Sequence, residues 1–130
     1  MKMKKEVITT KKAPQAIGPY SQAIVINNIV YTSGQIAIQP ETGVITANDI
    51  EGQTKQVCQN ISEILKSAGS HLDNVIKTTV FIKNMADFAK VNEIYATYFK
   101  TNPARSCVEV SKLPKDVLIE IEVIAYKDNI

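Results

Sequence analysis

The sequence contains no tryptophan, a single histidine, two cysteines and a single arginine among its 15 basic residues. Two cysteines far apart in the sequence form no disulfide framework, and one histidine without a Cys-x-x-Cys pair leaves too few ligands for a structural zinc site. No apolar run approaches the roughly 18 residues that a membrane span needs, no apolar stretch follows the lysine-rich start, and no glycine-rich phosphate-binding loop occurs. These absences predict a reduced, soluble, cytoplasmic protein without a membrane anchor or a metal.

The 130 residues are typical of one domain, and 45% apolar with 22% charged residues is an ordinary globular composition. Residues 1–12 hold five lysines and one glutamate, whereas residues 13–130 carry 10 basic and 12 acidic residues. We therefore interpret the chain as a single domain, 1–130, whose residues 1–12 form a flexible, solvated, lysine-rich end. The slightly acidic body has no basic stripe with interleaved aromatic residues, so we expect no nucleic-acid partner.

The spacing of apolar residues predicts the element order β-β-β-α-β-α-β-β. Strands are expected at 6–10, 23–26, 29–33, 75–83, 105–110 and 117–126, and helices at about 49–68 and 88–99. Each helix has one apolar stripe, so both are expected on the same face of one mixed sheet, an α+β fold. The other face of the sheet mixes apolar and charged residues, which suggests an oligomer interface.

Arg105 is the first candidate for chemistry, because it is the one arginine in a chain that uses lysine 14 times. Its planar fork can bind a carboxylate through two parallel hydrogen bonds, and the alternative is a structural ion pair with Glu120 or Glu122. Those glutamates lie on one face of an apolar strand, which favours a raised pKa and a role as general base or water-positioning group. The alternative for them is a structural pair with Lys112, Lys115 or Arg105, and the alternation does not choose between the two glutamates.

Cys107 shares the strand face of Arg105, and a nearby guanidinium favours a thiolate. Its one possible histidine partner is His71, which we interpret as a solvated loop residue, because a lone histidine lacks metal co-ligands. Cys58 lies beside the apolar stripe of the first helix and is interpreted as a packing residue. The aromatic residues of the second helical segment are expected in the core: Phe88, Tyr95, Tyr98 and Phe99.

Four blocks of sequence follow one another along the chain. They are 17–23 (IGPYSQA), 32–36 (TSGQI), 103–110 (PARSCVEV), and 113–116 with 119–122 (LPKD and IEIE). Together they resemble the RidA/YjgF family of reactive imine and enamine deaminases, over nearly the whole chain from about Ala13 to Tyr126. The resemblance implies a chorismate-mutase-like fold and a homotrimer, with three sheets in a central β-barrel, helices outside and ligand clefts between subunits.

The resemblance also implies an activity, the hydrolysis of 2-iminobutanoate and 2-iminopropanoate to 2-oxo acids and ammonia, with no cofactor. Such imines form when enamines released by pyridoxal-phosphate enzymes tautomerise. Carried over position by position, Arg105 grips the substrate carboxylate and Glu120 positions or activates the attacking water. The expected cleft also contains Tyr20, Ser33, Asn92 and Cys107, with backbone hydrogen bonds from Gly34 and Cys107.

Two other functions are alternatives, one using the same residues and one ascribed to some relatives in the family. The first is a regulatory trimer that binds 2-oxo acids without turnover, which would use the same arginine. The second is an RNA-directed ribonuclease, which the slightly acidic body disfavours.

Overall fold

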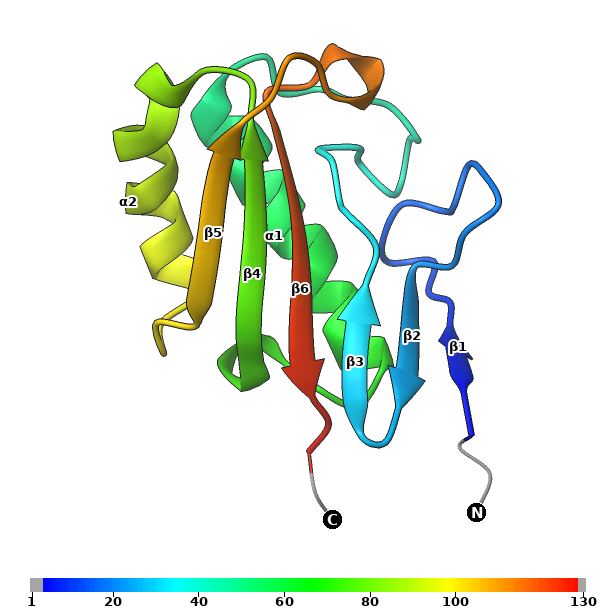
Figure 1. Cartoon of the computed structure of the whole chain (residues 1–130). Helices are drawn as coiled ribbons and strands as arrows, with labels where there is room; N and C mark the ends of the chain where they lie inside the picture. Colours follow the sequence, from blue (N-terminus) through cyan, green and yellow to red (C-terminus); the bar gives the residue numbers. More distant parts are fainter. Residues whose placement is uncertain (1–3, 129–130) are drawn as a thin grey trace.

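The computed structural model describes residues 4–128 as one mixed sheet with two helices on one face (Figure 1). The strands are β1 (Glu6–Ile8), β2 (Ala23–Ile26), β3 (Ile29–Thr32), β4 (Val75–Ile82), β5 (Ala104–Glu109) and β6 (Ile119–Tyr126), and the helices are α1 (Ile50–Ser67) and α2 (Phe88–Tyr98). The strand order is β1-β2-β3-β6-β4-β5, and β4–β5 is the one parallel pair among these strands. The predicted element order and α+β class are confirmed, and the sheet does not close into a barrel within one chain.

Local signals in the sequence set the ends of several elements. Asn27 and Asn28 have φ angles of 50° and 64°, a left-handed conformation that asparagine tolerates, and they close the β2–β3 hairpin. The side chain of Asp49 caps α1 by accepting a hydrogen bond from the N–H of Gly52. Gly69 follows α1 with a φ of 80°, which suits glycine. Strand β6 begins at Ile119 rather than at residue 117, because a 3-10 turn at Pro114–Asp116 precedes it.

The core lies between the sheet and the two helices. Strand β6 alternates as predicted, with Ile119, Ile121 and Val123 buried and the even-numbered residues on the other face. Cys58 on α1 is fully buried, and burial raises its pKa to about 12, which confirms the packing role. The four aromatic residues of the second helical segment join this core, Tyr95 and Phe99 as buried residues and Phe88 and Tyr98 as partly buried ones.

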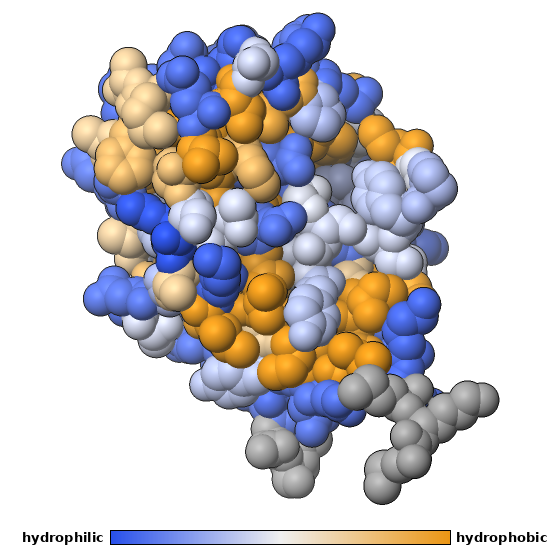
Figure 2. Space-filling view, viewed as in Figure 1, coloured by the Kyte–Doolittle hydropathy of each residue, from blue (hydrophilic) through white to orange (hydrophobic). Residues whose placement is uncertain are grey.

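The opposite face of the sheet, which we call the outer face, carries many exposed apolar side chains. Large hydrophobic residues on it are at least 43% exposed: Val7, Tyr31, Val108 and Tyr126. Figure 2 views this face and shows hydrophobic side chains gathered over the lower part of the sheet. Exposed hydrophobic side chains gathered in this way are typical of a face that contacts another protein chain.

Part of the lysine-rich end belongs to the sheet. Val7 of β1 pairs with Ile24 of β2, and Ile8 is buried. The strand predicted at 6–10 is therefore confirmed as the edge strand β1, and this part of the lysine-rich end is not free, while residues 1–3 lie outside the described part of the chain. Neither α1 nor any other helix within residues 4–128 has the length and hydropathy to cross a membrane.

Candidate functional site

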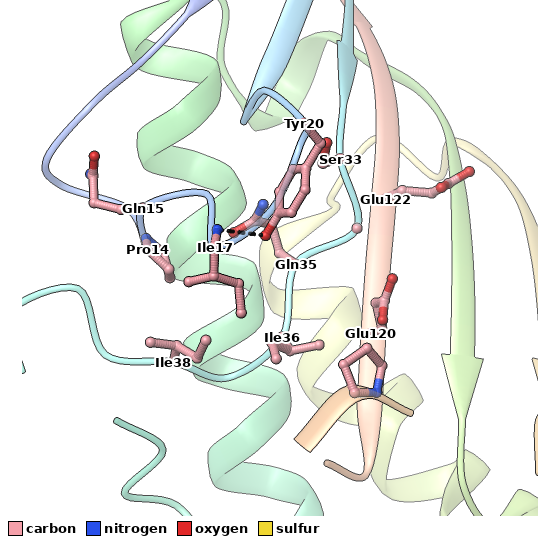
Figure 3. Close-up of a pocket in the computed structure, with 12 residues that line it drawn as sticks. Pro14, Gln15, Ile17, Tyr20, Ser33, Gln35, Ile36, Ile38, Glu120 and Glu122 are labelled. Carbon is pink, nitrogen blue, oxygen red and sulfur yellow. Dashed lines mark hydrogen bonds between the residues drawn. The ribbon is translucent and has the colours of Figure 1, made fainter. Parts of the chain in front are cut away.

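A cavity of about 410 Å³ opens where the chain leaves β3, beside the first residues of β6 (Figure 3). Four predicted site residues line it: Tyr20, Ser33, Gly34 and Glu120. Its other walls come mainly from the loop before β2 and the segment after β3: Pro14, Gln15, Ile17, Gln35, Ile36, Ile38, Pro114 and Glu122. We call it the Glu120 cavity. It places a carboxylate and hydroxyl groups beside an apolar wall.

Gly34 and Glu120, which both line this cavity, lie in close contact. The segment after β3 is fixed to β6 because the N–H of Gln35 donates to the carbonyl of Ile121 at 2.8 Å, and the N–H of Ile121 donates back at 3.1 Å. A Cβ on Gly34 would overlap Oε2 of Glu120 and lie 2.8 Å from its carboxyl carbon. The absence of a side chain at position 34 therefore makes the space in which the Glu120 carboxyl lies.

The fold perturbs the pKa of the Glu120 carboxyl. Partial burial raises the pKa of its carboxyl, and the negative charge of Glu122 raises it further. Glu122 itself is exposed. A carboxylate with a raised pKa is a stronger base than an ordinary one, so Glu120 is the better candidate for proton transfer.

The structural ion pairs that we considered for these glutamates are wrong. The ion pairs among the described residues include neither Glu120 nor Glu122. Lys112 instead contacts Asp116, with 3.4 Å between Nζ and Oδ1. Within residues 4–128, neither carboxylate therefore forms an ion pair with a lysine or arginine side chain.

Two hydroxyl groups line the same cavity as the Glu120 carboxyl. Ser33 Oγ donates to the carbonyl of Ser21 at 2.6 Å, which orients that side chain along the cavity wall. Tyr20 is 48% exposed, and its hydroxyl accepts a hydrogen bond from the N–H of Ile17 at 3.4 Å. Figure 3 shows the Tyr20 ring between Ile17 and strand β6, with its hydroxyl directed toward Ile17.

Gln22 holds the loop that carries Tyr20, and sequence reasoning missed it. This side chain is 3% exposed. Its Nε2 lies within hydrogen-bond distance of the carbonyls of Thr10, Ala13 and Pro14, and its Oε1 accepts from the N–H of Thr10 at 2.7 Å. The only signal in the sequence is a polar residue directly before a buried strand.

Arg105 lies in a different part of the molecule, on the helix-facing side of the edge strand β5. Its Nη1 donates to Oδ1 of Asn92 at 2.7 Å. Its guanidinium carbon lies over two rings of α2, 5.3 Å from the centroid of Phe88 and 4.9 Å from that of Tyr95. A second cavity of about 440 Å³ opens here, lined by Arg105, Asn92 and Tyr95 among others. Sequence reasoning assigned both aromatic residues to the core, although the spacing 88, 92, 95 places them on one helix face with Asn92.

Cys107 follows Arg105 on the same strand face, as predicted, and is partly buried. Burial raises the pKa of its thiol, and the positive charge of Arg105 lowers it by less. The guanidinium thus favours the thiolate as the sequence indicated, but desolvation outweighs it and the pKa of the thiol is raised. His71 is no partner for it, since its Nε2 lies 3.1 Å from Oδ1 of Asp128 near the end of the described chain.

The predicted site residues thus fall into two groups within one chain. Tyr20, Ser33 and Gly34 lie with Glu120, whereas Asn92 and Cys107 lie with Arg105. Strand β4 separates the strands of the two groups, and the Arg105–Glu120 ion pair that we considered does not form. Between residues 4 and 128, no three His, Cys, Asp or Glu side chains come together as metal ligands.

The chain forms an α+β domain, a mixed six-stranded sheet with two helices on one face. Its candidate site is a cavity in which a carboxyl with a raised pKa lies against a glycine. Comparison with family models then identifies the family. Residues 10–127 match the model described as Endoribonuclease L-PSP, and the chain belongs to this family, which is the RidA/YjgF family that the sequence motifs resemble.

Individual relatives agree with this assignment. A RutC family protein of Pyrococcus abyssi is 58% identical over 97% of this chain and 100% of its own length. The chloroplastic Reactive Intermediate Deaminase A of Arabidopsis thaliana is 52% identical over 95% of this chain and 66% of its own length. The crystal structure of E. coli TdcF with bound serine superposes with a TM-score of 0.90 at 45% identity, covering 95% of this chain and 99% of that one.

Proposed function

We propose that the protein is a deaminase that hydrolyses short 2-imino acids, such as 2-iminobutanoate and 2-iminopropanoate, to 2-oxo acids and ammonia without a cofactor. The observation that carries the proposal is the carboxyl of Glu120, which is partly buried, has a raised pKa and lies against Gly34 in a cavity. The 52% identity to a relative named Reactive Intermediate Deaminase A supports this choice of chemistry.

In the proposed reaction, Glu120 accepts a proton from a water molecule while the water oxygen attacks the C=N carbon and forms a carbinolamine. The imine nitrogen takes up a proton from solvent as the water adds, and the proton held by Glu120 then passes to the same nitrogen. The C–N bond breaks with its electron pair going to nitrogen, which leaves as ammonia. The carbinolamine hydroxyl loses its proton as the C=O bond forms. One imine and one water give one 2-oxo acid and one ammonia.

Arg105 binds the substrate carboxylate in this proposal, through two parallel hydrogen bonds from its fork. A carboxylate held in this way fixes the C=N group beside the water that Glu120 activates, which lowers the barrier by orientation. Tyr20, Ser33, Asn92 and Cys107 line the same cleft, and the backbone N–H groups of Gly34 and Cys107 are the proposed donors to the substrate.

We further propose that the two groups of site residues meet between copies of this chain, in a homotrimer whose three sheets form a central β-barrel. Two observations support this arrangement. Arg105 and Glu120 project from opposite faces of one sheet, and the outer face exposes residues such as Tyr31 and Tyr126. Sedimentation of the purified chain should give the mass of three copies, and Tyr31→Glu should shift it toward one copy.

A trapping assay tests the activity. An amino-acid dehydratase releases the imine precursor, and semicarbazide traps the imine that is not hydrolysed. Addition of the protein should suppress semicarbazone formation and release 2-oxobutanoate, and Glu120→Gln should keep 2-oxobutanoate binding but lose most of the suppression. Equal loss of binding and turnover in Glu120→Gln would instead indicate a structural role for this residue.

Two findings each favour another function. The bound serine in TdcF fits a module that binds small carboxylates without turnover, and wild-type protein that binds 2-oxobutanoate but suppresses no semicarbazone would support that function. The family description Endoribonuclease L-PSP suggests RNA cleavage. Steeply salt-dependent RNA binding by the full chain would support it, although the body beyond residue 12 carries more acidic than basic residues.

A further inference from the structure

The side chain of Arg105 is held in place although it lies on an exposed edge strand. Arginine has a long side chain with many rotamers, and an exposed one is ordinarily free to sample them. Here one polar and two aromatic side chains of α2 contact the same guanidinium: Asn92 at 2.7 Å, and the rings of Tyr95 and Phe88 with centroids 4.9 and 5.3 Å from its central carbon. Positive charge over an aromatic face is attracted by the electron-rich ring.

The Tyr95 ring is itself fixed on its far side. Its hydroxyl forms a buried 2.7 Å hydrogen bond with Oγ1 of Thr78. Thr78 is the residue of β4 that lies opposite Arg105 in the sheet register. Strand, ring and guanidinium therefore form a closed set of contacts, and the centroid of Phe99, 4.5 Å from that of Tyr95, adds packing beneath it.

We infer that Tyr95 and Phe88 are positioning residues that preorganise Arg105 for a carboxylate, which rests on the carboxylate-binding role proposed for Arg105. Asn92 accepts from Nη1, so the guanidinium keeps its other N–H groups for a ligand. The rings restrict rotation of the fork without accepting hydrogen bonds from its edge. A preorganised fork binds its ligand more tightly because less side-chain freedom is lost on binding.

The single arginine makes this inference directly measurable. In protein labelled with 15N-arginine, the one Nε–Hε group gives one signal, whose heteronuclear NOE reports the mobility of the Arg105 side chain without any ligand. We expect a rigid signal in the wild type and in Tyr98→Leu. We expect it also in Tyr95→Phe, because packing against Phe99 holds the ring when the hydroxyl bond to Thr78 is lost. We expect a mobile signal in Tyr95→Leu and in Phe88→Leu.

Tyr98→Leu is the matched control, because it removes a tyrosine of the same helix whose hydroxyl contacts Gln59 rather than the guanidinium. Phe88→Leu serves if Tyr95→Leu does not fold, since Phe88 is only partly buried. A wild-type signal as mobile as that of a free arginine side chain would overturn the inference, and so would a signal that stays rigid in both leucine variants.

Binding of 2-oxobutanoate then separates this inference from the proposed function. Tyr95→Leu should weaken binding about tenfold, whereas Tyr95→Phe and Tyr98→Leu should stay within about twofold of the wild type. In an Arg105→Lys background, Tyr95→Leu should cause little further loss, because the ring acts through the guanidinium; a full additional loss would contradict the inference. A rigid Arg105 that 2-oxobutanoate does not perturb would overturn the carboxylate role while the positioning by the rings stands.

Discussion

Arg105 and Glu120 lie on opposite faces of one sheet. Arg105 pairs with Thr78 of β4, whose side chain is buried under the helices, whereas Glu120 pairs with Phe81, which alternates to the outer face. A period of two along each strand fixes this separation, because a one-residue shift would move every side chain to the other face. One substrate that touches both groups would therefore bridge two copies of the chain.

A mixture of two inactive variants should regain activity. Arg105→Lys lacks the fork and Glu120→Gln lacks the base, but a cleft between copies can combine the intact Arg105 of one with the intact Glu120 of its neighbour. With random exchange of equal amounts in a trimer, about one cleft in four is intact. Co-refolded variants should therefore recover about a quarter of the wild-type rate in the trapping assay.

The control is a mixture of the two folded variants that is assayed directly after mixing, before subunits can exchange. Its activity should equal the mean of the two separate variants. A co-refolded sample that also stays at this mean would show that each site lies within one chain, and the shared cleft would then be abandoned.

Gly34→Ala should lower kcat strongly while the chain still folds. The new Cβ would overlap the Glu120 carboxyl, which must then leave its present position. We expect kcat to fall about 100-fold, because small displacements of a reacting group have large effects on rate. The expected loss in the free energy of unfolding is about 1–3 kcal/mol, from the overpacked contact.

Two further variants test whether overlap with the Glu120 carboxyl causes the effect of Gly34→Ala. Gly18→Ala places its Cβ at an ordinary 3.4 Å from Tyr20 and should unfold at nearly the wild-type denaturant concentration. Adding Glu120→Ala to Gly34→Ala should restore the stability, because the overlapping carboxyl is gone. If the double variant is as unstable as the sum of the two single variants, the contact is not the cause.

Most of the fold follows from the sequence because local patterns and long-range packing agree. The alternation in residues 117–126 identifies the buried face of β6, and Asn27-Asn28 identifies the hairpin. The strand order could not be read in this way. It depends on β6 inserting between β3 and β4, which joins residues 37 to 97 positions apart in the chain.

The site was predicted less completely, for a physical reason. The sequence pointed to Arg105 and Glu120 as site residues. Alternation within each strand did not show that the helices cover the face with Arg105 and leave the face with Glu120 open. The thiol of Cys107 shows the same difficulty, because the sequence indicated a nearby charge and not the burial that outweighs it. Gln22 acts through carbonyl groups of a loop, which no side-chain pattern records.

Gln22→Leu should destabilise the loop that carries Tyr20. The substitution keeps the approximate size but leaves the carbonyls of Ala13 and Pro14 without this donor. Loss of a buried hydrogen-bonding side chain costs about 1–3 kcal/mol per group left unpaired, so we expect a lower denaturation midpoint. The exposed Gln59→Leu is the control and should change the midpoint little. An unchanged midpoint in Gln22→Leu would show that water replaces these bonds.

The free energy of unfolding should depend on pH because the pKa of Glu120 is raised in the folded state. Its folded pKa is raised above the ordinary value of about 4.3 in an unfolded chain. The native state therefore binds the proton more tightly, so this contribution to stability is present below the unfolded pKa and is lost as pH rises through the folded pKa. Compared with Glu120→Gln, the wild type should lose stability over that interval, and urea unfolding at a series of pH values measures the difference.

The rate should depend on pH in the opposite sense, because a general base must be ionised. The acid limb of kcat/KM should lie above the usual range for a glutamate, at the raised pKa of Glu120. Glu122→Gln removes the neighbouring charge and should move this limb to lower pH while the maximal rate is kept. Glu63→Gln, on α1 beside Lys66, is the matched control and should leave the limb unchanged. If the limb of Glu122→Gln coincides with that of the wild type, the titrating group is not Glu120.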